Sequence, residues 1–238
     1  MKTAFVTGAN KSIGFEVVKQ LLELGYFVYL GSRDLDKGVK AAAILQSDHV
    51  KVIQIDVSDS ESIKEARRQI NSLDVLINNA GIRGSVPQTP ATVDISVIRE
   101  VFDTNFFGAI EVTQAFLDLL KISNAPRIVN VTSGLASLTL HNDPSWKYYN
   151  FKGGAYGPSK TALNAYTVAL AYELRDTPIK INVVDPGFTA TDFNQHRGTG
   201  TIQDAAARIV KYAIIDESGP TGQYFSEDNN PKTGVSPW

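Results

Sequence analysis

The chain has 238 residues, of which 43% are hydrophobic, and a formal net charge of -2, so its size and composition suit one α/β domain with a substantial core. The small net charge gives no reason to expect a nucleic-acid partner or an anionic membrane surface. The absence of cysteine excludes disulfides and thiolate metal sites, and the three histidines show no metal-ligand spacing. No apolar run approaches the length of a membrane span, and the first residues enter a strand at once, so we expect a cytoplasmic protein without a signal peptide.

Short β-rich runs alternate along the chain with longer runs of helical periodicity. We predict strands at 3–7, 27–30, 50–55, 73–78, 127–132, 180–184 and 223–225. We predict helices at 13–24, 36–45, 58–70, 93–120, 156–174 and 202–212, with the long region 93–120 divided near Asn105. This alternation predicts a single doubly wound Rossmann-type α/β domain over residues 1–238. In such a domain, helices cover both faces of a central parallel sheet, here of about seven strands.

Two stretches interrupt this rhythm, and both follow strands. The segment 136–154 is long and polar, and the segment 188–201 is rich in Thr, Gly and Asn. In an open α/β sheet the ligand lies beyond the carboxyl ends of the strands, so both segments are candidate walls of a substrate pocket. Their aromatic residues, with the last residue of the chain, are Trp146, Tyr148, Tyr149, Phe151, Phe188, Phe193 and Trp238. For each ring, ordinary packing is the simpler interpretation than direct substrate contact.

A glycine-bearing turn, T-G-A-N-K-S-I-G at 7–14, joins the first strand to the first helix. Such a turn allows backbone to approach a pyrophosphate, while the helix N-terminus adds free N–H groups and a positive dipole. Gly8 and Gly14 alone would equally fit a tight turn with close helix packing. The spacing differs from the common G-x-G-x-x-G. The position directly after the first strand favours nucleotide binding.

The end of the second strand carries Ser32 and Arg33, where an acidic residue would accept hydrogen bonds from the adenosine ribose and select NAD. With Lys11 of the glycine turn, Arg33 supplies a second cation near the same end of the site. Two such cations can bind a ribose phosphate through charge-assisted hydrogen bonds, which predicts NADP(H) as the cofactor. The alternative is a surface pairing of Arg33 with Asp34 or Asp36.

Tyr156 and Lys160 are four residues apart at the start of a predicted helix, so they share one helix face. A phenol has a pKa of about 10 and is a poor acid–base catalyst at neutral pH. A nearby ammonium favours the phenolate and lowers that pKa. By itself the spacing also arises by chance, as a packed ring beside a solvated amine.

In this order, the motifs resemble those of the short-chain dehydrogenase/reductase family over nearly the whole chain. The matching elements include the glycine turn at 7–14, N-N-A-G at 78–81 and P-G-F-T-A-T at 186–191. Asn10-Lys11 and Ser32-Arg33-Asp34 are similar to the family's carbonyl-reductase branch. The resemblance implies that the cofactor is bound by Gly8, Asn10, Lys11, Ser12, Ile13, Gly14, Ser32, Arg33, Asp56, Val57, Asn79, Ala80, Gly81, Tyr156, Lys160, Pro186, Gly187, Thr189 and Thr191. It implies that the catalytic residues are Asn105, Ser133, Tyr156 and Lys160, with no metal.

The same resemblance implies the role of each residue. Tyr156 would protonate a carbonyl oxygen that Ser133 holds in place. Lys160 would lower the pKa of Tyr156 and bind the nicotinamide ribose, and Asn105 would place a water that resupplies the proton. Asp56 would bind the adenine amine. The plain alternatives are a core tyrosine, a capping serine and an asparagine that interrupts a helix.

Two departures from the family pattern stand out. Ser12 replaces the middle glycine of the turn, where backbone approaches phosphate. Ser133 and Tyr156 are 23 residues apart, a longer gap than in the family's compact members. The extra segment 138–154 resembles the insert of monomeric carbonyl reductases. If it folds over the helix that begins at Tyr156, it blocks the family's four-helix interface, so we slightly favour a monomer. The alternative is that the segment only walls the substrate pocket.

The sequence therefore predicts an NADPH-dependent carbonyl reductase that transfers hydride to a small-molecule ketone or aldehyde. One alternative is an alcohol dehydrogenase that works in the oxidative direction. Another is a catalytically silent dinucleotide-binding regulator, which the four intact catalytic residues disfavour.

Overall fold

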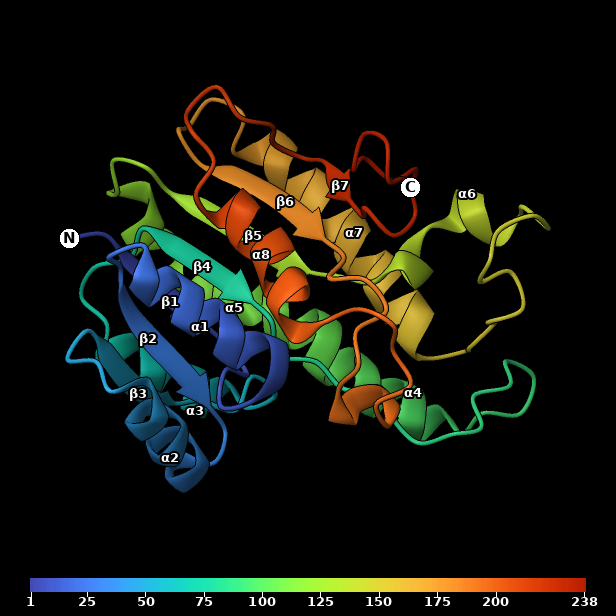
Figure 1. The fold of residues 1–238 in the computed structure, drawn as a ribbon, viewed down its shortest axis with the longest axis horizontal. Coiled ribbons are helices and arrows are strands. Elements are labelled where there is room, and N and C mark those ends of the chain that lie inside the picture. The colour runs from blue at the N-terminus through green and yellow to red at the C-terminus, as the bar shows by residue number, and fades with distance from the viewer.

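A seven-stranded parallel sheet forms the centre of the computed structural model, which describes residues 1–238 (Figure 1). The strand order is β3-β2-β1-β4-β5-β6-β7. The strands are β1 Thr3–Val6, β2 Phe27–Ser32, β3 Val50–Gln54, β4 Val75–Asn78, β5 Arg127–Val131, β6 Lys180–Val184 and β7 Tyr224–Phe225. The chain moves outward from β1 to β3 and then returns to the other side of β1. The switch point, where doubly wound sheets bind ligands, therefore lies between β1 and β4.

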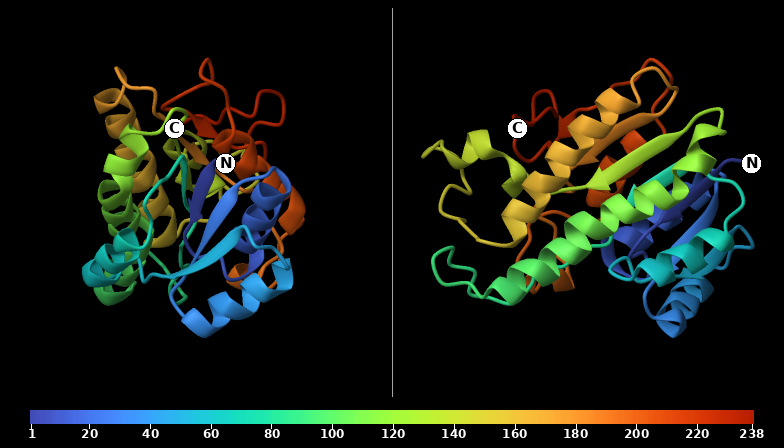
Figure 2. Two further views of the ribbon diagram at one scale, coloured as in Figure 1. Left: turned by 90° about the vertical axis from the view of Figure 1, so that its left-hand side faces the viewer. Right: turned by 180° about the vertical axis from the view of Figure 1, so that it is seen from behind.

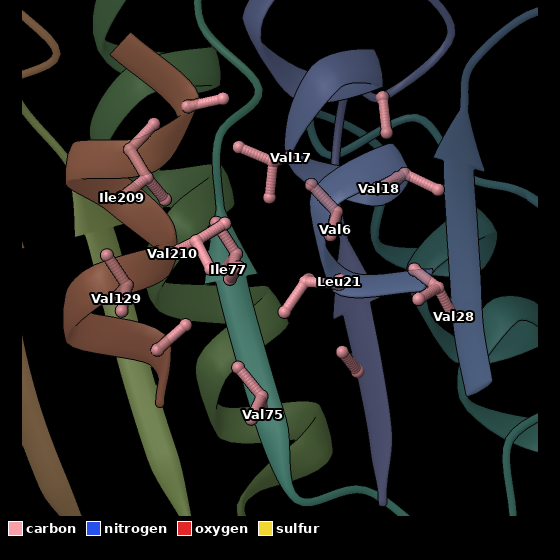
Figure 3. Close-up of a cluster of buried hydrophobic side chains, with 14 of the residues drawn as sticks. Val6, Val17, Val18, Leu21, Val28, Val75, Ile77, Val129, Ile209 and Val210 are labelled. Carbon is pink, nitrogen blue, oxygen red and sulfur yellow. The ribbon is translucent and has the colours of Figure 1, made fainter. Parts of the chain in front are cut away.

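Helices cover both faces of the sheet (Figures 1 and 2). They are α1 Ser12–Glu23, α2 Leu35–Leu45, α3 Ser60–Arg68, α4 Ile95–Phe102, α5 Gly108–Lys121, α6 Leu138–His141, α7 Tyr156–Glu173 and α8 Ile202–Ala213. On one face α1 and α8 lie over the central strands, as Figure 3 shows. On the other face lie α3, α5 and α7. No helix combines the length and the apolar character needed to cross a bilayer.

Both cores follow from the two-residue period of the strands, because successive side chains point to opposite faces. Val6 and Ile77 enter the core under α1 and α8. Phe5 and Leu76 enter the opposite core, where the ring of Phe5 lies 5.1 Å from that of Phe116. Full burial of one such side chain contributes about 1.5–3 kcal/mol. The near-continuous apolar strands of the sequence are therefore explained by burial on both faces.

The predicted elements are all present, with boundaries shifted by a few residues. The long helical region divides as expected, since α4 and α5 are joined by a π-helical turn, η1 Asp103–Phe107, which contains Asn105. The sequence did not predict α6, because four residues are too few to establish a helical period. The 3₁₀ turns η2 Gly134–Ala136 and η3 Asp192–Asn194 were missed for the same reason.

The segment 138–154 does not cover α7, so the expected reason for a blocked interface is wrong. On the outer side of α7, Ala169 is exposed and Tyr172 is 69% exposed. The segment extends instead beyond the carboxyl ends of the strands, where α6 stands apart from α7 in Figure 1. Its ring at Trp146 is buried and hydrogen-bonds to Asn229. The segment thus buries its rings against the C-terminal part of the chain, and it lies where a pocket wall was the alternative expectation.

Candidate active site

The ends of β1 and β4 are tied together at the switch point. The Thr7 hydroxyl accepts the N–H groups of Asn79 at 3.1 Å and Ala80 at 3.0 Å. In return, the Asn79 side-chain amide donates to the carbonyls of Thr7 at 2.9 Å and Gly8 at 3.1 Å. The N-N-A-G element therefore holds the glycine turn in place, with Ala80 and Gly81 beside it.

The two glycines of the turn are required by close backbone contacts. Gly8 has a φ of +63°, and a Cβ there would lie 2.9 Å from Cα of Ala80. A Cβ on Gly14 would overlap the Asn79 amide and lie 2.6 Å from the Gly8 carbonyl oxygen. Ser12 is also left-handed, with a φ of +56°, which costs a non-glycine residue about 1–2 kcal/mol. Glycine, which the family pattern described above has at this position, would adopt the same conformation without this strain.

The adenosine end of the site carries two exposed cations. Arg33 has a side chain 77% exposed, and its nearest acid is Asp56, 3.9 Å away. Lys11 lies 2.9 Å from Asp192, and both side chains are more than half exposed. Exposed pairs contribute only about 0–1 kcal/mol, so an anionic ligand can displace them. The alternative pairing of Arg33 with Asp34 does not occur.

The neighbouring residues of this end are already engaged within the chain. Ser32 is buried, and its hydroxyl donates to the Asp34 carbonyl at 2.7 Å instead of facing the groove. Asp34 caps α2 by accepting the Lys37 N–H. The Asp56 carboxylate accepts from the N–H and the hydroxyl of Ser58 at 3.0 and 2.7 Å. Of this group, Arg33 keeps the most exposed donor groups.

Asn105 is buried in the π-helical turn and holds two other segments. Its amide nitrogen donates to the Ile82 carbonyl at 2.9 Å and to the Ser159 hydroxyl at 3.0 Å. Its amide oxygen accepts the Ile82 N–H at 2.8 Å. Both amide donors are therefore occupied. A π-helical turn is often found at functional sites, which fits the predicted importance of this residue.

Tyr156 and Lys160 lie on the first turns of α7, as predicted. The N–H of Tyr156 donates to the Gln88 side chain at 3.1 Å, and its ring lies 5.2 Å from that of Phe193. Lys160 is only 4% exposed, and its ammonium donates to the Val131 carbonyl at 2.8 Å.

Gly81 locates these groups relative to one another. A Cβ on Gly81 would lie 3.4 Å from Nζ of Lys160 and 3.3 Å from Oδ1 of Asn105. The N-N-A-G element, the π-helical turn and α7 therefore meet at one point, at the carboxyl end of β4.

The electrostatics of the Tyr156–Lys160 pair differ from expectation. Burial lowers the pKa of Lys160 to about 8. Burial also raises the pKa of Tyr156 well above its usual value, while a hydrogen bond from Ser133 lowers it and the charge of Asp185 raises it further. The predicted lowering of the Tyr156 pKa by Lys160 is therefore not found. The physical reason is that the Lys160 ammonium is directed to a backbone carbonyl.

Ser133 caps the turn η2, where its hydroxyl oxygen accepts the Leu135 N–H at 3.2 Å. This contact uses the hydroxyl as an acceptor, so its hydrogen can donate, and it donates to Tyr156 in this structure. Ser133 therefore is a capping serine, which was the alternative that the sequence left open. The capping contact is compatible with a hydrogen bond from the same hydroxyl to a substrate oxygen.

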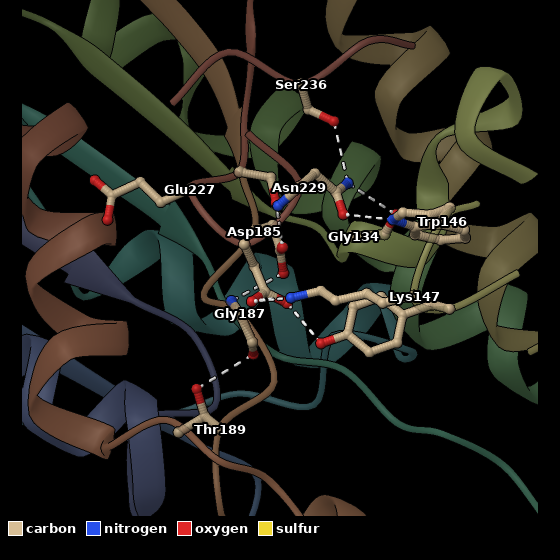
Figure 4. A network of polar contacts seen from close by, with 12 residues as sticks. Gly134, Trp146, Lys147, Asp185, Gly187, Thr189, Glu227, Asn229 and Ser236 are labelled. Atoms are coloured by element: carbon tan, nitrogen blue, oxygen red, sulfur yellow. Dashed lines mark hydrogen bonds and ion pairs between the residues drawn. The ribbon is translucent and has the colours of Figure 1, made fainter. Parts of the chain in front are cut away.

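The loop after β6 is held on both sides (Figure 4). The Gly187 N–H donates to the Asp185 carboxylate at 3.0 Å, and Gly187 has a φ of +84°. Arg208 of α8 donates to the Pro186 carbonyl at 2.8 Å. Thr189 and Thr191 are nearly fully buried. The loop with the predicted nicotinamide contacts is therefore fixed in position.

An edge-to-face series of rings lies next to this loop. Trp146 is 5.4 Å from Tyr148, which in turn is 6.0 Å from Phe151 and 6.2 Å from Phe188. Phe151 and Phe188 remain partly exposed at 60% and 38%. The rings pack mainly on one another, as expected, and the two exposed ones offer apolar surface.

Sequence reasoning missed four residues that support the catalytic groups: Gln88, Ser159, Asp185 and Tyr224. Asp185 had a recognisable signal, because it is an acidic residue directly after the apolar strand β6 and before Pro186. Gln88 and Tyr224 had none, since their partners are distant in the sequence, and for Ser159 only the nearby contact with Tyr156 was within reach of the sequence.

A dinucleotide-binding sheet with this constellation at its switch point defines a nicotinamide-dependent oxidoreductase. A family model described as short chain dehydrogenase matches residues 2–201. The chain is 31% identical to a (+)-neomenthol dehydrogenase of Capsicum annuum, with 93% of this chain and 94% of that protein covered. It is 29% identical to salutaridine reductase of Papaver bracteatum, with 94% of each covered. The chain belongs to the short-chain dehydrogenase family.

A solved structure agrees with this assignment. The NADPH-bound carbonyl reductase from chicken fatty liver superposes with a TM-score of 0.84 at 25% identity, over 100% of this chain and 99% of that one.

Proposed function

We propose that this enzyme reduces a ketone or aldehyde to an alcohol with NADPH. The observation that carries the proposal is the convergence of Lys160 and Asn105 on Gly81, with Tyr156 one helical turn before Lys160 on α7, beside a glycine turn that leaves no room for a side chain. The names of its relatives, which are reductases and a dehydrogenase of ketone–alcohol pairs, support the same reaction class.

The residues present fit NADPH. The glycine turn at 7–14 provides backbone N–H groups at the N-terminus of α1, where a pyrophosphate is favoured. Lys11 and Arg33 provide exposed cations for a ribose phosphate. No acidic residue ends β2 to receive the ribose hydroxyls of NAD. When bound, the cofactor supplies the hydride, and the protein supplies position and a proton.

Tyr156 acts as the general acid. Its pKa lies above the neutral range, so the phenol is protonated there and has the proton that a carbonyl oxygen must receive. Ser133 donates its hydroxyl hydrogen to the substrate oxygen. Lys160 binds the ribose hydroxyls beside Tyr156, and its lowered pKa keeps the loss of the ammonium proton within reach near pH 8.

Asn105 holds the segment around Ile82 and the first turn of α7 in register. Both of its amide donors are occupied, so a water that resupplies the proton would use a remaining acceptor. The candidates are the second lone pair of Oδ1 and a backbone carbonyl released by the π-helical turn. This refines the sequence-based role without changing it.

The test is the consumption of reduced cofactor with a panel of alicyclic ketones, aryl ketones, keto esters and aldehydes, with NADPH and NADH compared. We expect turnover of at least one class and a preference for NADPH. An oxidative dehydrogenase would instead show its higher efficiency with NADP⁺ and the matching alcohols. A silent regulator would bind NADPH with no turnover of any panel member.

The oligomeric state and the cellular location are proposals separate from the reaction. The segment 138–154 leaves the outer face of α7 free, so the structure adds no support to the monomer that the sequence slightly favoured. Light scattering after size exclusion tests it: a mass near 25.9 kDa supports the monomer, and four times that mass rejects it. A cytoplasmic location is tested by cell fractionation.

A further inference from the structure

The short peptide segment Ser133–Gly134, at the end of β5, is held by three side chains from the later part of the chain. The Tyr224 hydroxyl donates to the Ser133 carbonyl at 2.6 Å. The Asn229 amide donates to the Gly134 carbonyl at 3.2 Å. The Gly134 N–H donates to the Asp185 carboxylate. Figure 4 shows Asp185 and Asn229 close to Gly134. Hydrogen bonds to the carbonyls of Ser133 and Gly134, and from the N–H of Gly134, therefore hold the backbone that carries the Ser133 side chain.

Tyr224 delivers its hydroxyl from a rigid position. It lies in β7, pairs with Val183 of β6, and is 1% exposed. Its carbonyl accepts the Ser236 N–H at 2.9 Å, so β7 is held on its other side as well. Its ring lies 5.6 Å from that of Trp238. Burial raises the pKa of Tyr224 far above its usual value, so the hydroxyl remains a donor throughout the working pH range.

The other two side chains join this support to the rest of the site. Asp185 also accepts the Ser226 hydroxyl at 2.6 Å, so one buried carboxylate connects Gly134, Gly187 and the segment after β7. The Asn229 oxygen accepts the indole N–H of Trp146 at 3.2 Å, which connects the pocket wall. The three side chains thus form one continuous network.

The direction of the Ser133 side chain depends on this network. Its hydroxyl oxygen already accepts the Leu135 N–H, which leaves only the hydroxyl hydrogen for a substrate oxygen. Rotation of the Ser133 peptide would turn that hydrogen away from Tyr156. A misplacement of about 1 Å at a catalytic group can reduce the rate about a hundredfold. The family match ends at residue 201, so Tyr224 and Asn229 lie outside the matched region.

We propose that Tyr224 is a positioning residue for Ser133, whose hydroxyl it holds in line with the substrate's carbonyl oxygen through its hydrogen bond to the Ser133 carbonyl. The inference rests on the proposed function, in which Ser133 contacts that oxygen. It adds a residue from β7 to the machinery, and it assigns the last strand of the sheet a part in the geometry of the reaction.

The first test is Tyr224→Phe, which removes one hydroxyl and keeps the ring. We expect kcat to fall about tenfold, with KM and the NADPH Kd changed by less than about twofold, because an orientation effect acts mainly in the transition state. The matched control is Tyr212→Phe. Tyr212 is also buried and stacks on Phe225 at 3.8 Å, but its hydroxyl makes no hydrogen bond to a catalytic residue. The control should keep the kcat of the unsubstituted enzyme. Unchanged kcat in Tyr224→Phe, or an equal loss in both variants, overturns the inference.

A double-mutant cycle with Ser133→Ala decides whether Tyr224 acts through Ser133. If it does, Tyr224→Phe changes the residual kcat of Ser133→Ala by less than about twofold, since the group to be positioned is gone. Losses that multiply show an effect independent of Ser133 and overturn this inference alone. Near-normal turnover of Ser133→Ala contradicts the proposed role of Ser133, and the positioning role falls with it. NADPH titration of each variant shows independently that the fold is intact.

Discussion

The buried ammonium of Lys160 reduces the stability of the fold. The size of this loss in the free energy of unfolding can be worked out from the structure. Lys160 is 4% exposed, and burial lowers its pKa from 10.5 to about 8. Since one pKa unit corresponds to about 1.4 kcal/mol, the charged form is disfavoured by roughly 3 kcal/mol at neutral pH. Lys160→Met keeps the unbranched apolar part of the side chain and removes the charged terminal nitrogen. It also loses the hydrogen bond to the Val131 carbonyl, worth about 1 kcal/mol. We therefore expect a net stabilisation of about 2 kcal/mol at pH 7.

The stability difference between Lys160→Met and the unsubstituted protein should depend on pH in a definite direction. The pKa of Lys160 in the folded protein lies below its unfolded value of 10.5. Between about pH 8 and that value, the unfolded chain binds a proton that the folded chain does not, so the stability of the unsubstituted protein rises with pH. The variant lacks this group. Its advantage should therefore be largest at or below about pH 7 and should shrink steadily toward pH 10.

The assay is urea denaturation of both proteins at several pH values, together with turnover. The variant should be more stable at neutral pH and should have lost most of its activity. Lys40→Met is the matched control, because Lys40 is exposed on α2 and makes no hydrogen bond or ion pair; it should change neither quantity. A variant that is no more stable at neutral pH, or whose advantage does not vary with pH, would refute the reasoning.

Three further predictions concern the cofactor site and the catalytic acid. Arg33→Ala should weaken NADPH binding roughly ten- to a hundredfold and leave NADH binding unchanged by fluorescence titration; equal weakening of both would exclude a phosphate contact. Ser12→Gly should relieve the left-handed strain and stabilise the fold by about 1 kcal/mol in urea, whereas a loss of stability would show that the Ser12 hydroxyl outweighs the strain. Asp185→Asn should lower the pKa of Tyr156, because it removes a charge that raises it, so the phenol should ionise at lower pH in an ultraviolet absorbance titration, with Tyr156→Phe as the reference. An unchanged titration of the phenol would mean that Asp185 does not act on Tyr156.

The sheet and the placement of Tyr156 and Lys160 on one helix could be predicted because both depend on short-range patterns. Two-sided burial makes the strands largely apolar, as in β4, where Val75, Leu76 and Ile77 are buried, and this is visible in the sequence. The Tyr156–Lys160 spacing is likewise a local helical feature. Helix boundaries were shifted by only a few residues for the same reason.

Contacts between distant segments could not be predicted. Tyr224 and Ser133 are 91 residues apart, and no spacing relates them. The segment 138–154 was expected to pack over α7, which is wrong. Its aromatic rings could be buried either against α7 or against the C-terminal loops, and the sequence does not show which surface is preferred. The pKa of Tyr156 was misjudged because the Lys160 ammonium is directed at the Val131 carbonyl, a choice set by tertiary structure.

The most direct measurement of the proposed chemistry is the turnover of Tyr156→Phe with NADPH and the best ketone of the panel. The ring is kept and only the transferable proton is lost, so the NADPH Kd should stay within about twofold of that of the unsubstituted enzyme. General-acid catalysis typically contributes about 10²–10⁴-fold, and we expect kcat to fall by at least the lower figure. Near-normal turnover of this variant would contradict the assignment of Tyr156 as the proton donor.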